Sequence, residues 1–133
     1  MLLVVIDTNV LVSALLSPGS NSAKILRLAM EGRIVPCFDS EILLEYESVL
    51  FRPKFPFRAA DVASLLEQLR KTGFSVAPMP SDITFQDESD RKFYEVAKFC
   101  NATLITGNLK DFPRAPWILS PTDFCAKHLH NPC

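Results

Sequence analysis

The stretch that decides the fold is LLVVIDTN, residues 2–9, close to the start of the chain. Its first five residues form an unbroken aliphatic run, which is typical of a strand buried on both faces of a parallel sheet. The polar residues Asp7, Thr8 and Asn9 come directly before the apolar pattern of residues 10–15, so a helix is predicted to begin there and to end near residues 17–19. Asp7 is therefore predicted to lie at the carboxyl end of a central strand.

The same alternation of strand and helix patterns continues along the chain. Further strands are predicted at residues 34–38, 74–77, 102–106 and 117–119, and further helices at 22–31, 40–51, 59–71, 88–100 and 121–129. Two prolines make residues 52–58 a loop, and residues 78–86 form another. This order predicts one domain over residues 1–133 with an α/β fold, a three-layer α/β/α sandwich around a mainly parallel central sheet.

Composition and charge exclude several classes of protein. The 14 Lys and Arg residues nearly balance the 15 Asp and Glu residues, so a generally basic nucleic-acid coat is excluded and any nucleic-acid contact must use a local patch. The cysteines at 37, 100, 125 and 133 form no zinc-binding pattern and are expected to be free thiols of a reducing compartment. Because no apolar stretch approaches about 18 residues, we expect a cytoplasmic protein without membrane contact.

Acidic residues follow the predicted strands at the edge where open parallel sheets bind ligands. Asp7 ends the first strand, and a charge in so apolar a run needs a partner or a metal ion. A helix N-cap is the simpler interpretation of this residue. Asn108 and Asp111 follow the strand at 102–106 in the sequence TGNLKD, where a Gly-Asn turn equally explains Asn108.

Two predicted helices carry further candidate acids. Glu45 and Glu47 border opposite sides of the apolar stripe of the helix at 40–51, so helical spacing does not choose between them, and either suits a solvated surface. Asp90 shares a face with Phe93 at the start of the helix at 88–100. The alternative there is a capping arrangement, with Asp87 as the N-cap and acids favoured by the helix dipole.

Several carboxylates in one cleft would raise one another's pKa, so such a site either holds protons or binds divalent cations. A site with only oxygen donors suits Mg²⁺ or Mn²⁺ rather than zinc. Such ions serve phosphodiester hydrolysis well, because they activate water and stabilise the charge that develops on phosphate oxygens. The acidic pattern therefore favours a nuclease.

Four segments of the chain resemble the successive motifs of PIN-domain proteins, specifically the VapC-like toxins. They are VVIDTNVLVSALL from residue 4, EILLEYESVLFRPKF from residue 41, DESDRKFYEVAKFCNATLITGN from residue 87 and LKDFP from residue 109. The resemblance implies a PIN fold and a Mg²⁺- or Mn²⁺-dependent endoribonuclease. It also implies the toxin half of a toxin-antitoxin pair, with a cognate antitoxin protein as partner and often a homodimeric state.

Carried over position by position, the resemblance implies six metal ligands, and it selects Glu45 over Glu47. They are Asp7, Glu45, Asp87, Asp90, Asn108 and Asp111, of which Asp7, Glu45, Asp90 and Asp111 are also expected to be catalytic. Asn108 departs from the pattern, because many relatives have aspartate there, and Asp111 is expected to supply the missing carboxylate. Thr8, Asn9 and Thr106 match positions that orient the carboxylates by hydrogen bonds.

The expected substrate is single-stranded or structured RNA, whose splayed backbone can enter such a cleft. Candidate phosphate contacts are Arg52, Lys54, Arg58, Lys92, Lys110 and Arg114, although a solvated surface charge explains each of them as well. Asn108 keeps one alternative open, a catalytically weak or inactive PIN module that acts by binding nucleic acid or protein. A receiver-like phosphoacceptor would need an adjacent acid pair after the first strand, which Asp7-Thr8 lacks.

Overall fold

The computed structural model describes residues 2–129, which form a five-stranded parallel sheet with the strand order β3-β2-β1-β4-β5. The strands are β1 (Leu3–Ile6), β2 (Val35–Phe38), β3 (Phe74–Ser75), β4 (Thr103–Ile105) and β5 (Ile118–Leu119). β1 is the central strand: Leu3 pairs with Val35 on one side and Val4 pairs with Thr103 on the other. Val4, Val5 and Ile6 are almost completely buried, as the aliphatic run predicts.

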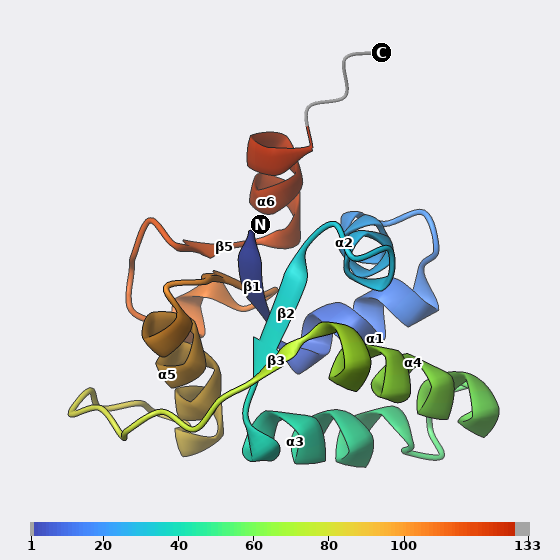
Figure 1. Ribbon diagram of the computed structural model, residues 1–133, viewed down its shortest axis with the longest axis horizontal. Coiled ribbons are helices and arrows are strands. Elements are labelled where there is room, and N and C mark those ends of the chain that lie inside the picture. The colour runs from blue at the N-terminus through green and yellow to red at the C-terminus, as the bar shows by residue number, and fades with distance from the viewer. Residues whose placement is uncertain (1, 130–133) are drawn as a thin grey trace.

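Helices cover both faces of the sheet and thereby confirm the predicted three-layer architecture. The helices are α1 (Thr8–Leu16), α2 (Asn21–Met30), α3 (Ser40–Leu50), α4 (Ala59–Thr72), α5 (Arg91–Cys100) and α6 (Pro121–His128). α5 packs on β1, β2 and β4 on one side, while α1, α2 and α4 lie on the other side (Figure 1). α3 runs below the carboxyl ends of β1 and β2 in this view and contacts α1, α4 and α5.

Side-chain caps and one close backbone approach set the ends of these elements. Asp39 Oδ1 accepts the amide of Ile42 at 2.8 Å, which begins α3 where the sequence predicts. Gly73 ends α4 against β2, and a Cβ there would stand only 2.4 Å from the carbonyl oxygen of Pro36. The chain can therefore pass from α4 into β3 only with glycine at this position.

The predicted helix at 88–100 is divided in the structure. Residues Glu88–Asp90 form a 3₁₀ turn, η1, and α5 begins only at Arg91. The reason is local, because the Asp87 carboxylate accepts both the amide of Ser89 at 2.9 Å and its hydroxyl at 2.7 Å, which favours a tight turn over the α-helix. Asp87 is thus the cap that the sequence suggested. Asp90 stands at the junction, and its side chain caps nothing.

The predicted strands at 74–77 and 117–119 are shorter in the structure, where β3 and β5 each have two residues. Both are the outer strands of the sheet. Pro78 follows β3 closely, and a proline has no amide with which to continue the ladder. These short edges leave the sheet well paired only around β1.

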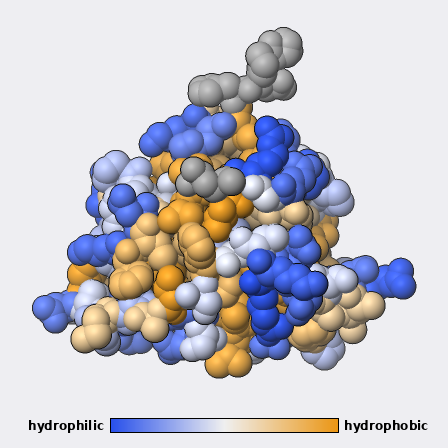
Figure 2. Space-filling model, viewed as in Figure 1, coloured by the Kyte–Doolittle hydropathy of each residue, from blue (hydrophilic) through white to orange (hydrophobic). Residues whose placement is uncertain are grey.

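Buried side chains of the strands and of the surrounding helices form one hydrophobic core. Figure 2 shows hydrophobic surface along the middle of one face, over β1 and β2.

Among residues 2–129, no helix is both long and apolar enough to cross a bilayer. Cys37, Cys100 and Cys125 are free thiols, as expected, and Cys133 lies outside the described residues.

Candidate functional site

Asp7 is held by hydrogen bonds at the carboxyl end of β1. Its side chain is 6% exposed, and its Oδ2 accepts the Thr106 hydroxyl at 2.7 Å and the Asn9 amide group at 3.2 Å. Asp7 occupies the N-cap position of α1, but its side chain makes no capping hydrogen bond. The capping interpretation therefore does not account for this carboxylate, which points to its two polar neighbours instead.

The neighbours of Asp7 connect the ends of β1 and β4. The Asn9 side-chain oxygen accepts the amide of Gly107 at 3.0 Å, and the Thr106 hydroxyl accepts the amide of Asn108 at 3.0 Å. Thr106 is completely buried. Each of these two side chains thus bonds to Asp7 and also to the loop after β4, which fixes both partners before any ligand arrives.

The environment raises the pKa of the Asp7 carboxyl. Burial is the largest cause, because it disfavours the charged form, and the negative charge of Glu45 adds to it. The Thr106 hydrogen bond and the positive charge of Lys92 lower the pKa and offset part of this effect. A cation next to Asp7 would therefore be favoured electrostatically.

Glu45 projects from α3 toward this site and is bound at both oxygens. Its Oε1 pairs with Lys92 Nζ at 2.8 Å, and its Oε2 accepts a short hydrogen bond from the Thr8 hydroxyl. Glu47 instead pairs with Arg70 at 3.8 Å, and both of those side chains are more than 40% exposed. The structure thus separates two glutamates that helical spacing left equivalent, and it places Glu45 beside Thr8.

Tyr46 fixes the position of α3 against β1. The Tyr46 hydroxyl donates to the carbonyl oxygen of Ile6 at 2.5 Å, and the side chain is 2% exposed. This bond joins the residue after Glu45 to the residue before Asp7. The sequence placed Tyr46 in the apolar stripe and gave no signal for its hydrogen-bonding role.

Asp90 is a half-buried carboxyl under like-charge repulsion. Desolvation and the charges of Asp7, Asp87 and Asp111 raise its pKa to about 6, while Lys92 opposes the shift. Asp87 behaves differently, because its hydrogen bonds from Ser89 lower its pKa. The charges of Asp7, Asp87 and Asp111 therefore all act on Asp90, and Asp87 also caps η1.

Asn108 and Asp111 lie in the exposed loop after β4, where residues Leu109–Asp111 form a second 3₁₀ turn, η2. Asp111 is close enough for its charge to act on Asp90. Asn108 contacts the site through its backbone amide, which donates to Thr106. The loop therefore brings the Asp111 carboxylate to the edge of a group of carboxylates, Asp7, Glu45 and Asp90, which we call the acidic cluster.

The predicted phosphate contacts fall into three groups. Lys92 is 11% exposed and is ion-paired with Glu45, so it lies within the acidic cluster rather than on the surface. Lys110 and Arg114 are exposed in the loop after β4. The loop of residues 52–58, which carries the other three cations, lies at the end of α3 remote from α5 (Figure 1).

The donors at this site fit a divalent cation in chemistry and charge, since they are carboxylate oxygens whose mutual repulsion and burial disfavour an uncompensated charge. These carboxylates are, however, not close enough together to form a complete metal-binding group. Among residues 2–129, no three Asp, Glu, His or Cys side chains already stand together as a metal-binding group. Lys92 takes the place of a counter-ion at Glu45.

Comparison with known proteins defines the class. The profile of the PIN domain family matches residues 3–110, and the chain therefore belongs to this family. Members are commonly nucleases and typically use divalent metal ions. The chain is also 36% identical over 110 residues to an uncharacterized protein of Methanocaldococcus jannaschii, MJ1680. The match covers 79% of this chain and 70% of that protein.

Proposed function

We propose that the protein is a Mg²⁺- or Mn²⁺-dependent endoribonuclease. One observation carries the proposal: buried Asp7, fixed by Thr106 and Asn9, lies within electrostatic reach of Glu45 and Asp90 at the carboxyl edge of the sheet. Burying a carboxylate and surrounding it with others costs stability. A cation bound there would offset this cost by neutralising the negative charges. Membership of a family of nucleases supports the same chemistry.

Asp7, Glu45, Asp90 and Asp111 are the proposed ligands, with Asp87 and Asn108 at the margin of the site. When bound, the ion supplies positive charge for the phosphate oxygens and lowers the pKa of water. The protein's own residues do the positioning. Thr106 and Asn9 orient Asp7 by hydrogen bonds, and Thr8 orients Glu45.

RNA is the proposed substrate because a single strand can follow the open edge of the sheet past the acidic cluster. The exposed cations Lys110 and Arg114 lie in the loop that also carries Asp111, so they are available to phosphates near the site. The role of toxin in a toxin-antitoxin pair, with an antitoxin and a second copy of the chain as partners, is proposed on the resemblance of the four sequence motifs.

A second candidate function is a PIN module that binds RNA without cleaving it efficiently. Two observations favour it. Asn108 brings no charge to the site, and Lys92 already neutralises Glu45. Under this alternative the acidic cluster would bind Mn²⁺ weakly or not at all.

The test is cleavage of a mixed single-stranded RNA by the purified protein with Mg²⁺ or Mn²⁺ and with EDTA. We expect metal-dependent cleavage that Asp7→Asn abolishes. Asp61→Asn is the matched control, because Asp61 is exposed on α4 and should leave cleavage unchanged. Cleavage that persists in EDTA or in Asp7→Asn would contradict the proposal, and absence of both cleavage and calorimetric Mn²⁺ binding would favour the binding module.

A further inference from the structure

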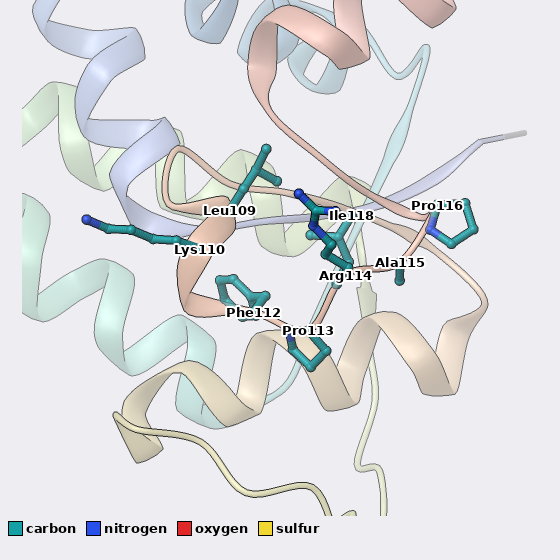
Figure 3. A pocket seen from close by; sticks show the side chains of 8 residues that line it. All are labelled: Leu109, Lys110, Phe112, Pro113, Arg114, Ala115, Pro116 and Ile118. Atoms are coloured by element: carbon teal, nitrogen blue, oxygen red, sulfur yellow. The ribbon is translucent and has the colours of Figure 1, made fainter.

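A cavity of about 790 Å³ opens between η2 and β5, on the loop that follows β4. Its volume lies in the range of roughly 300 to 1,000 Å³ that small-molecule sites occupy. Figure 3 shows that its lining comes from one continuous segment of the chain, which begins at Leu109 and ends at Ile118. The cavity is thus built by a short loop and one edge strand.

The lining combines apolar walls with two cations. Leu109, which is 41% exposed, and Pro113 present apolar surface, and the largely buried Phe112 also lines the cavity. The Arg114 guanidinium turns toward Leu109, whereas Lys110 extends away from the other lining residues (Figure 3). Neither cation forms a salt bridge with another residue of the described chain. Both charges are therefore available to an anionic ligand.

The position of the cavity relates it to the acidic cluster. η2 contributes Leu109 and Lys110 to the cavity and, one residue later, contributes Asp111, whose charge acts on Asp90. Asn108, immediately before η2, donates its amide to Thr106 beside Asp7. A strand of nucleic acid that crosses the acidic cluster would therefore continue along this loop.

We infer that this cavity binds one nucleotide of the substrate RNA next to the bond that is cut, with its base between the apolar walls and the Arg114 guanidinium and its phosphate on Lys110, outside the cavity. The inference rests on the proposed function and gives it a substrate subsite. Apolar side chains and an arginine plane suit the flat face of a base, and they do so without reading its hydrogen-bonding edge. The subsite therefore favours unpaired nucleotides over paired ones and has little sequence preference.

The test separates base binding from phosphate binding. Fluorescence anisotropy in EDTA would compare a labelled oligouridylate with an abasic ribose-phosphate strand of the same length and charge. We expect the wild-type protein to bind the oligouridylate at least about fivefold more tightly, because stacking contributes to each bound base. Leu109→Ala and Arg114→Gln should reduce this ratio toward one.

Matched controls lie on other surfaces of the protein. Leu16→Ala removes a leucine of similar exposure on α1, and Arg33→Gln removes an exposed arginine on the loop before β2. Both should keep the wild-type ratio. The inference is overturned if the wild-type protein does not distinguish the two strands, or if Leu109→Ala and Arg114→Gln keep the wild-type ratio while thermal melts show them folded.

This outcome is independent of cleavage. If the protein cleaves RNA but the two cavity variants bind and cleave as the wild type does, the subsite is wrong and the nuclease stands. If neither cleavage nor Mn²⁺ binding occurs but base-dependent binding is lost in the cavity variants, the cavity is still a nucleotide-binding site and the nuclease proposal fails. Because both substituted residues are exposed, their loss should leave the stability nearly unchanged.

Discussion

The acidic cluster has two halves that are held in different ways. At the strand ends, Asp7 is buried and bonded to Thr106 and Asn9, both of which also bond to the loop after β4. On the helices, Glu45 is held by an ion pair with Lys92 at one oxygen and by the Thr8 hydroxyl at the other, and Asp90 has no side-chain hydrogen bond among residues 2–129. The strand half is thus positioned by neutral hydrogen bonds alone, and the helix half also depends on the positive charge of Lys92.

If these carboxylates bind a cation, as proposed, the difference means that the site would combine fixed and adjustable ligands. We expect the hydrogen bonds between Asp7 and its neighbours to persist when a cation binds, because each donor is itself held by the backbone. The Lys92–Glu45 pair responds to charge, since a divalent ion would compete with the ammonium for the same carboxylate. Substitutions of Glu45, Thr106, Lys92 and Asp90 test this distinction.

The largest effect is expected for Glu45→Gln compared with Glu47→Gln. The first substitution removes a proposed ligand with little change in shape, so the rate of RNA cleavage should fall by about 100-fold or more. Glu47 pairs with Arg70 at the surface of the same helix, and its substitution should change the rate by less than about twofold. Equal effects of the two substitutions on single-turnover cleavage would remove Glu45 from the site.

Thr106→Val tests the strand half. The substitution keeps the shape of the buried side chain but leaves Asp7 Oδ2 without its shortest hydrogen bond and the Asn108 amide without its acceptor. Loss of such an orienting partner typically lowers metal affinity by about 10- to 100-fold. Calorimetric titration with Mn²⁺ should show this loss, whereas Thr106→Ser should restore most of the affinity. If Thr106→Val binds Mn²⁺ like the wild type, the hydrogen bond does not position Asp7.

Lys92→Met tests the charge balance of the helix half. Without metal, Glu45 and its acidic neighbours lose their counter-charge, so the free energy of unfolding should fall by about 2 kcal/mol. With Mn²⁺, the competing ammonium is gone, so the rise in Tm that the ion causes should be larger than in the wild type. Thermal melts with and without Mn²⁺ measure both. A smaller Mn²⁺-induced rise in the variant would show that Lys92 assists the ion instead of competing with it.

The smallest effect concerns the pH dependence of stability in EDTA. The pKa of Asp90 is raised to about 6 in the folded protein, so its protonated form adds stability that is complete below about pH 4 and is lost as the pH rises through 6. Asp90→Asn removes this dependence and should stabilise the protein at pH 8, relative to pH 4, by less than about 1 kcal/mol, because solvent screens the group.

Asp87→Asn is the control with the opposite sign. The pKa of Asp87 is lowered by its hydrogen bonds from Ser89, so its contribution is present above the unfolded pKa and is lost as the pH falls. Its substitution should therefore destabilise the protein at pH 8. Urea unfolding of the two variants at pH 4 and pH 8 measures how each substitution changes the free energy of unfolding. A change of the same sign in both variants would contradict the conclusion that neighbouring carboxylates repel Asp90.

The parts of the fold that are readable in the sequence are those with strong local patterns. β1 is buried on both faces, so its apolar run identifies the strand, and Asp7 follows from its end. The division of the helix at 88–100 depends on the Asp87 side chain bonding to Ser89, which competes with a helix pattern that looks continuous. The spacing of apolar residues along the sequence therefore does not reveal where this helix is interrupted.

The site was only partly readable for a different reason. Glu45 and Glu47 have equivalent helical spacing, and only the family resemblance preferred Glu45 before the structure showed its partners. Lys92 looks like a surface cation in the sequence, because its partner lies 47 positions away on another helix. Pairings between distant elements depend on tertiary packing, and a single sequence carries no record of them.

The hydrogen bond from Tyr46 to Ile6 gives the protein an internal optical reporter. The ring is buried, its pKa is raised by burial and by the charges of Asp7 and Glu45, and its hydroxyl is bonded one residue from Asp7. The near-ultraviolet absorption of a phenol shifts with the electric field around it. Binding of a cation at the carboxylates should therefore appear as a tyrosine difference spectrum that Tyr46→Phe removes, without any attached label.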